Sequence, residues 1–105
     1  MQITVSGHHV NVTEGMRSRA YQLASKLMKF FDGITHIHVR MEVDSDGQVA
    51  EFTLEAPQHH TFTSKAKAHD MYAALDNAAE KLERQLTRVK EKLHDRRTRS
   101  GKRTV

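Results

Sequence analysis

Residues 70–93 read DMYAALDNAAEKLERQLTRVKEKL, and this stretch decides the fold. Its apolar residues recur in steps of three and four, which is the period of one face of an α-helix. The apolar set comprises Met71, Leu75, Ala78, Ala79, Leu82, Leu86, Val89 and Leu93. With Asp70 as its N-cap, the pattern predicts an amphipathic helix over residues 70–94. Such a helix would be about 37 Å long and would overhang the sheet of a small domain.

The charges of this helix separate by sign. On a helical wheel with Leu82 at its centre, the basic residues follow one flank and the acidic residues follow the other. The basic row is Lys81, Arg84, Arg88 and Lys92. The acidic flank is Asp76, Glu80, Glu83 and Glu91. Because a merely solvated helix usually mixes its signs in i,i+4 pairs, the basic row indicates a polyanionic partner.

A second amphipathic helix is predicted over residues 14–31, with Thr13 as its N-cap and Gly33 closing its end. Its basic side chains also gather on one flank, without an intervening acid, and they are Arg19, Lys26 and Lys29. We expect the basic rows of the two helices to line one groove. A groove of that kind follows a phosphate backbone better than a flat face does.

Four segments alternate apolar and polar residues, which is the pattern of a strand with one buried face. They cover residues 2–6, 36–43, 48–55 and 60–66. A hairpin turn is predicted between the second and third strands, at the sequence DSDG of residues 44–47. The resulting order β-α-β-β-β-α predicts an α+β fold with two helices packed on one face of a four-stranded sheet.

The open face of this sheet argues against two common modes of RNA binding. An RRM stacks bases on exposed sheet aromatics, but Phe52 and Phe62 have the parity of the buried set. The G-x-x-G loop of a KH domain is also absent. What remains is recognition of a folded RNA through its phosphates and its shape.

Length and composition exclude further classes of function. The 105 residues suffice for one domain, no apolar run approaches a membrane span, and the absence of cysteine excludes disulfides and cysteine zinc sites. The N-terminal residues have no secretory signal, so the expected location is the cytoplasm. Residues 65–105 hold 12 Lys/Arg against 6 Asp/Glu. We therefore expect a domain over residues 1–95, followed by a flexible basic tail over residues 96–105.

Eight histidines suggest a metal site, but their spacing argues against one. A structural or catalytic zinc ion needs three or four converging protein ligands, whereas six of these histidines come in three pairs. The pairs, at which we expect only adventitious metal binding, are His8 and His9, His36 and His38, and His59 and His60. No Walker motif, nucleophile elbow or H-E-x-x-H sequence occurs. We expect no enzyme activity, no cofactor and no small-molecule substrate.

Two runs in the last predicted helix resemble a known family. They are DMYAALD at residues 70–76 and KLERQLTR at residues 81–88, and the opening MQITVSG supports them. This pattern resembles the short bacterial ribosome hibernation promoting factors and the related ribosome-associated inhibitor A, over residues 1–95. The second domain of the long form and the acidic tail of the inhibitor have no counterpart in it. The basic tail favours the promoting-factor branch.

The resemblance implies a fold like that of double-stranded-RNA-binding domains, and binding in the messenger and transfer RNA channel of the small ribosomal subunit. Such a factor binds idle ribosomes in stress or stationary phase, inhibits translation and promotes inactive ribosome dimers. Lys67 joins the RNA-binding residues through the resemblance alone, and Arg96 joins them from the tail. The full predicted set is Arg19, Lys26, Lys29, Lys67, Lys81, Arg84, Arg88, Lys92 and Arg96.

We expect the free protein to be a monomer without a membrane partner, bound in use to ribosomal RNA. Two alternatives stay open at this point. The first is a generic double-stranded-RNA-binding module, which would prefer bare duplex RNA to small subunits. The second is a metal-carrying protein built on the histidine pairs.

Overall fold

The order of the elements follows the predicted pattern. The computed structural model of the chain describes residues 2–57 and 60–104, with side chains described for residues 2–57 and 61–92. The elements are β1 (Gln2–His8), α1 (Glu14–Phe30), β2 (His36–Asp44), β3 (Gly47–Ala56), β4 (His60–Ala68) and α2 (Met71–Thr104). The predicted α+β class and the order β-α-β-β-β-α are confirmed.

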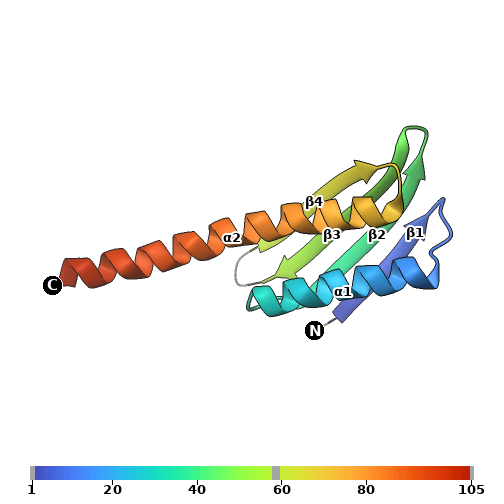
Figure 1. The fold of residues 1–105 in the computed structure, drawn as a ribbon. Helices are drawn as coiled ribbons and strands as arrows, with labels where there is room; N and C mark the ends of the chain where they lie inside the picture. The colour runs from blue at the N-terminus through green and yellow to red at the C-terminus, as the bar shows by residue number, and fades with distance from the viewer. Residues whose placement is uncertain (1, 58–59, 105) are drawn as a thin grey trace.

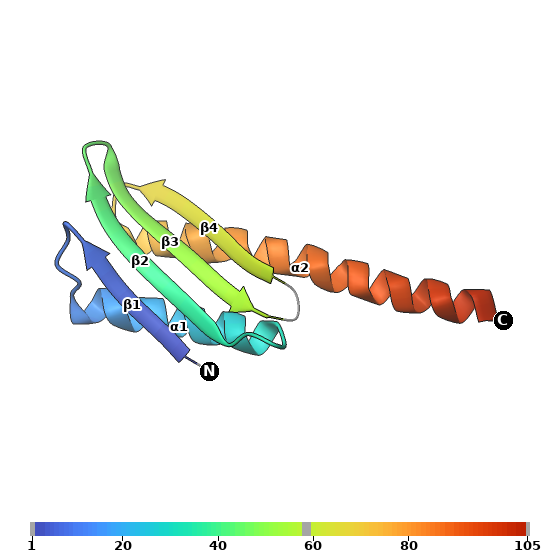
Figure 2. The ribbon, with the colours of Figure 1, turned by 180° about the vertical axis from the view of Figure 1, so that it is seen from behind.

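The strands form one mixed sheet in the order β1-β2-β3-β4. β1 runs parallel to β2, whereas β2, β3 and β4 form an antiparallel meander. A parallel pair needs a crossover connection, and α1 supplies it. Both helices therefore cover the same face of the sheet and lie side by side, with α1 on β1 and β2 and α2 on β3 and β4 (Figure 1). Figure 2 shows the opposite face, which no helix covers.

The core lies between the sheet and the helices. Alternate residues of the central strands are fully buried, among them Val39 and Phe52, and so are the leucines of the α2 stripe, including Leu82. Among the described residues Ser64 is the one buried polar side chain, and its hydroxyl donates to the carbonyl oxygen of Ala78 at 2.7 Å. This bond connects β4 directly to α2. Together with the buried apolar stripe, it sets how α2 is rotated about its axis on the sheet.

The two predicted N-caps are confirmed. The Thr13 hydroxyl accepts from the amide of Met16 at 3.1 Å, and a carboxylate oxygen of Asp70 accepts from the amide of Ala73 at 2.9 Å. The end of α1 differs from the expectation, because Phe31 leaves the helix in an extended conformation and is buried. Gly33 adopts a φ of 90° in the turn that follows.

α2 is longer than the sequence analysis predicts. It runs to Thr104 instead of ending near residue 94, and it projects beyond the sheet in a molecule of 58 × 26 × 19 Å (Figure 1). The predicted end was wrong because it was placed where the apolar stripe stops. Lysine and arginine have high helix propensity and continue a helix without an apolar partner. The division into a domain over residues 1–95 and a flexible tail over residues 96–105 stays a prediction.

Candidate nucleic-acid interface

The basic row of α2 lies on the flank of the helix that points away from α1. Two side chains fix this flank along β4: the Lys81 ammonium donates to the carbonyl oxygen of Lys65 at 3.0 Å, and the Gln85 amide donates to that of Thr63 at 2.9 Å. The side chains of this row, Lys81, Arg84, Arg88 and Lys92, are all exposed. None of the four forms an ion pair with a side chain of residues 2–57 or 61–92. The row therefore presents uncompensated positive charge to solvent.

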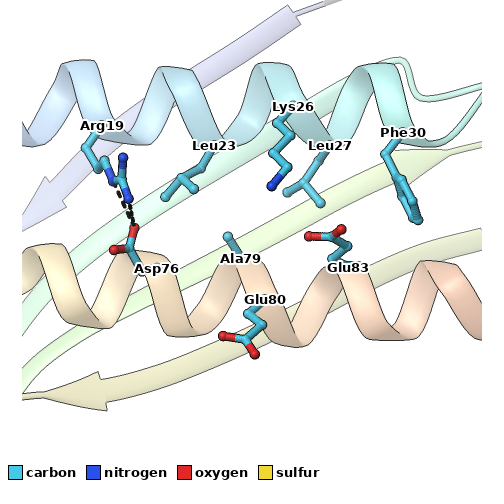
Figure 3. Close-up of a pocket in the computed structure, with 9 residues that line it drawn as sticks. All are labelled: Arg19, Leu23, Lys26, Leu27, Phe30, Asp76, Ala79, Glu80 and Glu83. Atoms are coloured by element: carbon cyan, nitrogen blue, oxygen red, sulfur yellow. Dashed lines mark hydrogen bonds and ion pairs between the residues drawn. The ribbon is translucent and has the colours of Figure 1, made fainter.

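The flank of α2 that faces α1 is acidic. A groove of about 290 Å³ separates the two helices (Figure 3). Its lining comprises Arg19, Leu23, Lys26, Leu27 and Phe30 of α1, and Asp76, Ala79, Glu80 and Glu83 of α2. The prediction that the basic rows of both helices line one groove is therefore wrong. A helical wheel separates the two flanks of α2, but the position of α1 on the sheet decides which flank faces it.

Arg19 bridges the two helices. Its Nε and Nη2 atoms each lie 2.8 Å from Oδ1 of Asp76, and both side chains are partly exposed (Figure 3). Since this carboxylate offsets the guanidinium charge, Arg19 does not extend an open basic row along α1. Its predicted RNA contact would require this pair to break or to be shared.

The other two predicted cations of α1 are exposed. Lys26 stands at the edge of the groove, and Lys29 lies on the outer face of α1. The sequence analysis did not single out the uncharged polar residues that line this outer face with them, which are Ser18, Tyr21, Gln22 and Ser25. Their signal was present in the sequence, because positions 18, 21, 22, 25 and 29 repeat with the period of one helical face.

Lys67 lies against the hairpin between β2 and β3. Its ammonium is 3.1 Å from a carboxylate oxygen of Asp44 and 3.6 Å from one of Asp46. Hydrogen bonds from the amide of Asp46 and then from Lys67 lower the pKa of Asp44, and the Asp44 carboxylate in turn raises the pKa of Lys67. Lys67, a predicted RNA-binding residue, thus already pairs with carboxylates of the β2–β3 hairpin.

This arrangement makes a prediction for the titration of Asp44. The depressed pKa means that the contribution of Asp44 to stability is present above pH 3.8 and is lost as the pH falls through the folded-state pKa. Lys67→Met should raise the pKa of Asp44 toward 3.8 without reaching it, because the amides of Asp46 and Gly47 still donate to the carboxylate. Carboxyl NMR during an acid titration measures this shift. Lys65→Met is the control, and an Asp44 pKa that does not respond to Lys67→Met would contradict the ion pair.

The open face of the sheet carries histidines and hydroxyls in place of Phe, Tyr or Trp rings. Nε2 of His36 lies 2.8 Å from the Thr4 hydroxyl, and Nε2 of His38 lies 2.8 Å from the Ser6 hydroxyl. Phe52 is buried on the other face, as the alternation predicts, and so is Phe62. In the part of the chain that the structure describes, the open face of the sheet therefore offers no Phe, Tyr or Trp ring for base stacking, and its only rings are imidazoles.

The remaining predictions concern histidines outside the helices and residues that the structure does not describe. His8 belongs to β1, which continues past the predicted strand end at residue 6, and its ring centroid lies 4.1 Å from that of His9. His59 and the side chains of His60 and Arg96 lie outside the described residues. Within the described residues, no three His, Asp or Glu side chains converge as metal ligands, and no helix is long and apolar enough to cross a membrane.

Fold and charge together define a small α+β protein whose two helices both carry exposed cations, with the row of α2 on the flank away from α1. Residues 3–94 match the family described as Sigma 54 modulation protein / S30EA ribosomal protein, and the chain belongs to this family. The ribosome hibernation promoting factor of Pseudomonas putida is 40% identical over 92 residues, which are 88% of this chain and 89% of that protein. The factor of that name from Klebsiella oxytoca is 39% identical over 93 residues, 89% of this chain and 97% of that protein. The resemblance found in the sequence is confirmed.

Two solved structures share the fold. The ribosomal subunit interface protein of Coxiella burnetii superposes with a TM-score of 0.76 at 23% identity, covering 87% of this chain and 99% of that one. The N-terminal domain of Protein Y from Thermus thermophilus gives a TM-score of 0.74 at 24% identity, covering 85% and 99%. These similarities support the arrangement of two helices on one face of the sheet.

Proposed function

We propose that this protein is a ribosome hibernation factor of the cytoplasm, which binds the small ribosomal subunit in the channel for messenger and transfer RNA. While bound it would exclude both RNAs sterically, inhibit translation and promote inactive ribosome dimers. One observation carries the proposal. In a chain that belongs to this family, a row of cations on α2 is exposed and has no carboxylate partner among the described side chains: Lys81, Arg84, Arg88 and Lys92. No step of this mechanism requires a catalytic group or a cofactor.

The contacts would be made mainly to phosphates. Guanidinium groups such as those of Arg84 and Arg88 bind phosphate oxygens in a bidentate manner, and ammonium groups add point charges. Because the open face of the sheet presents no Phe, Tyr or Trp ring in its described part, base identity would contribute little. The fold would instead select the shape of the folded ribosomal RNA.

The remaining predicted residues contribute to different degrees. Lys26 and Lys29 add a second set of exposed cations on α1. Lys67 and Arg19 contribute less, since each already pairs with a carboxylate in the free protein. Arg96 keeps its predicted role as an additional phosphate contact from the C-terminal segment.

A sucrose-gradient profile of ribosomes tests this function. When the protein is added to ribosomes without messenger, the protein should sediment with the small subunits, and the ribosomes should shift toward dimers. A pull-down with bare duplex RNA is the matched comparison. If the protein preferred duplex RNA and did not co-migrate with small subunits, it would be a generic double-stranded-RNA-binding module instead.

Binding to small subunits should weaken steeply with salt. Six of the predicted RNA-binding cations are exposed and pair with no carboxylate among the described side chains: Lys26, Lys29, Lys81, Arg84, Arg88 and Lys92. If all six contact phosphates, the slope of log K against log[salt] should be roughly −4 to −5, at about 0.7–0.9 per contact. Co-sedimentation over a range of potassium concentrations measures this slope. A value near −1 would mean that apolar contacts dominate the interface.

A further inference from the structure

The α2 row and Lys29 of α1 face in different directions. The groove between them holds an acidic strip, the carboxylates of Glu80 and Glu83, with Lys26 at its α1 edge. We propose that the protein bridges two separate segments of RNA backbone, one on each side, and that the strip between its helices rejects a single strand or duplex laid along them. This inference rests on the proposed function and specifies the geometry of its RNA partner. It follows from three features of the helical face.

The first feature is the separation of the cations. The α2 row is fixed along β4, at one edge of the sheet, by the bonds of Lys81 and Gln85 to the β4 backbone. Lys29 lies on the outer face of α1, over the opposite half of the sheet. Since α1 and α2 lie side by side between these two surfaces, one backbone cannot follow both without crossing the groove (Figure 1).

The second feature is the charge of that groove. Asp76 is neutralised by Arg19, but the carboxylates of Glu80 and Glu83 have no partner among the side chains of residues 2–57 and 61–92. Figure 3 shows Glu83 on α2 across the groove from Lys26, without a bond between them. A phosphate backbone in this groove would meet two uncompensated negative charges, and like charges at contact distance repel strongly.

The third feature is the C-terminal end of α1, where Lys90, a lysine on the groove side of α2, is already engaged. The Lys90 ammonium donates to the carbonyl oxygen of Phe30 at 3.0 Å and lies 4.3 Å from the centre of the Phe30 ring. It serves the last turn of α1, where a cation is favoured by the helix dipole. Because Lys90 is bound to Phe30 and not to a carboxylate, it does not neutralise the charges of Glu80 and Glu83.

A bridging protein and a protein that lies along one duplex respond differently to loss of cations. We compare Lys26→Met/Lys29→Met with Lys81→Met/Lys92→Met, alone and combined, in binding to purified small subunits and to a short RNA duplex. On small subunits each pair should cost about tenfold in affinity, and the two costs should multiply, because both surfaces are engaged at once. On the duplex each pair alone should cost about twofold, because the remaining surface still binds, and the combined variant should lose binding.

The acidic strip is tested with a charge-matched control. Glu80→Gln/Glu83→Gln should raise affinity for the duplex roughly fivefold or more and leave affinity for small subunits within about twofold. Glu51→Gln/Glu55→Gln, which removes the same charge from the open face of the sheet, should change duplex affinity by less than about twofold. A thermal melt of each variant shows that it is folded.

The outcomes separate this inference from the proposed function. If the unchanged protein does not prefer small subunits to duplex RNA, the proposed function fails. If it does prefer them, but Lys26→Met/Lys29→Met leaves subunit affinity unchanged, only the bridging inference is overturned. The same holds if removing the carboxylates of Glu80 and Glu83 raises subunit and duplex affinity equally, because one backbone would then run along the groove in both.

Discussion

Arg84→Glu/Arg88→Glu is expected to abolish binding to small ribosomal subunits at physiological salt. Both guanidinium groups are exposed on the outward flank of α2 and have no ion-pair partner in the described part of the chain. Losing two charge-assisted contacts at about 1.5 kcal/mol each lowers affinity by a factor of roughly 100. The two new carboxylates would add repulsion from the phosphates. Co-sedimentation with purified subunits measures the loss.

The fold of this variant should survive, because exposed substitutions usually change the free energy of unfolding by less than about 0.5 kcal/mol. The control is Arg17→Glu/Arg40→Glu, which makes the same change of charge at two exposed arginines: Arg17 of α1, and Arg40 of β2, which pairs with Glu42 at 3.5 Å. This control should bind nearly as well as the unchanged protein. A folded Arg84→Glu/Arg88→Glu protein that still co-sediments with subunits would show that the α2 row is not the interface.

Leu82→Ala is expected to have the largest effect on stability. Leu82 is completely buried at the centre of the α2 stripe, and a buried Leu→Ala substitution costs about 2–5 kcal/mol. For a chain of about 100 residues, that corresponds to a fall in Tm of about 8 °C or more. Thermal unfolding followed by circular dichroism measures it.

Leu23→Ala is the control for this prediction. Leu23 is only partly buried where it lines the groove between the helices, so its truncation should cost clearly less than that of Leu82. The comparison matters for function, because the burial of Leu82 fixes the rotation of α2 that points Arg84 outward and Glu83 toward α1. Equal costs for the two substitutions would mean that α2 packs on a different face.

The sequence was sufficient to predict the order of the elements and the buried faces of β2, β3 and α2. The strands were predictable because alternation selects a strand buried on one side, and Ile37, Val39 and Met41 are fully buried. The α2 stripe was equally clear, since apolar residues at steps of three and four leave a single packing face. Local patterns of this kind need no knowledge of the neighbouring elements.

The residues that line the groove could not be predicted from a helical wheel, because a wheel shows the faces of one helix and not the position of the neighbouring helix. Which flank of α2 meets α1 depends on the crossover between β1 and β2, which places α1 over the first half of the sheet. Applying that rule would have brought the acidic flank to α1 and suggested a partner for Arg19, which is Asp76. The engagement of Lys67 was likewise hidden, since it depends on the β3–β4 register that carries Lys67 to the β2–β3 hairpin.

The corrected geometry alters the proposed mechanism in one respect. Positive charge does not form a single channel between the helices. Of the six exposed RNA-binding candidates without a carboxylate partner in the described part of the chain, α2 supplies four on the flank away from α1. The helix α1 supplies Lys29 on its outer face and Lys26 at the edge of the groove. A protein of this shape would act as a wedge between RNA segments. It would exclude other RNAs by occupying the space between those segments.

The central claim is that the protein occupies the channel of messenger and transfer RNA on the small subunit, and a competition measurement tests it most directly. Labelled protein is bound to purified small subunits, and messenger with its cognate transfer RNA is then titrated in, while the fluorescence anisotropy of the label is followed. The account predicts full displacement, with an apparent affinity of the protein that falls in proportion to the added RNA. Simultaneous binding of protein, messenger and transfer RNA to one subunit would contradict it.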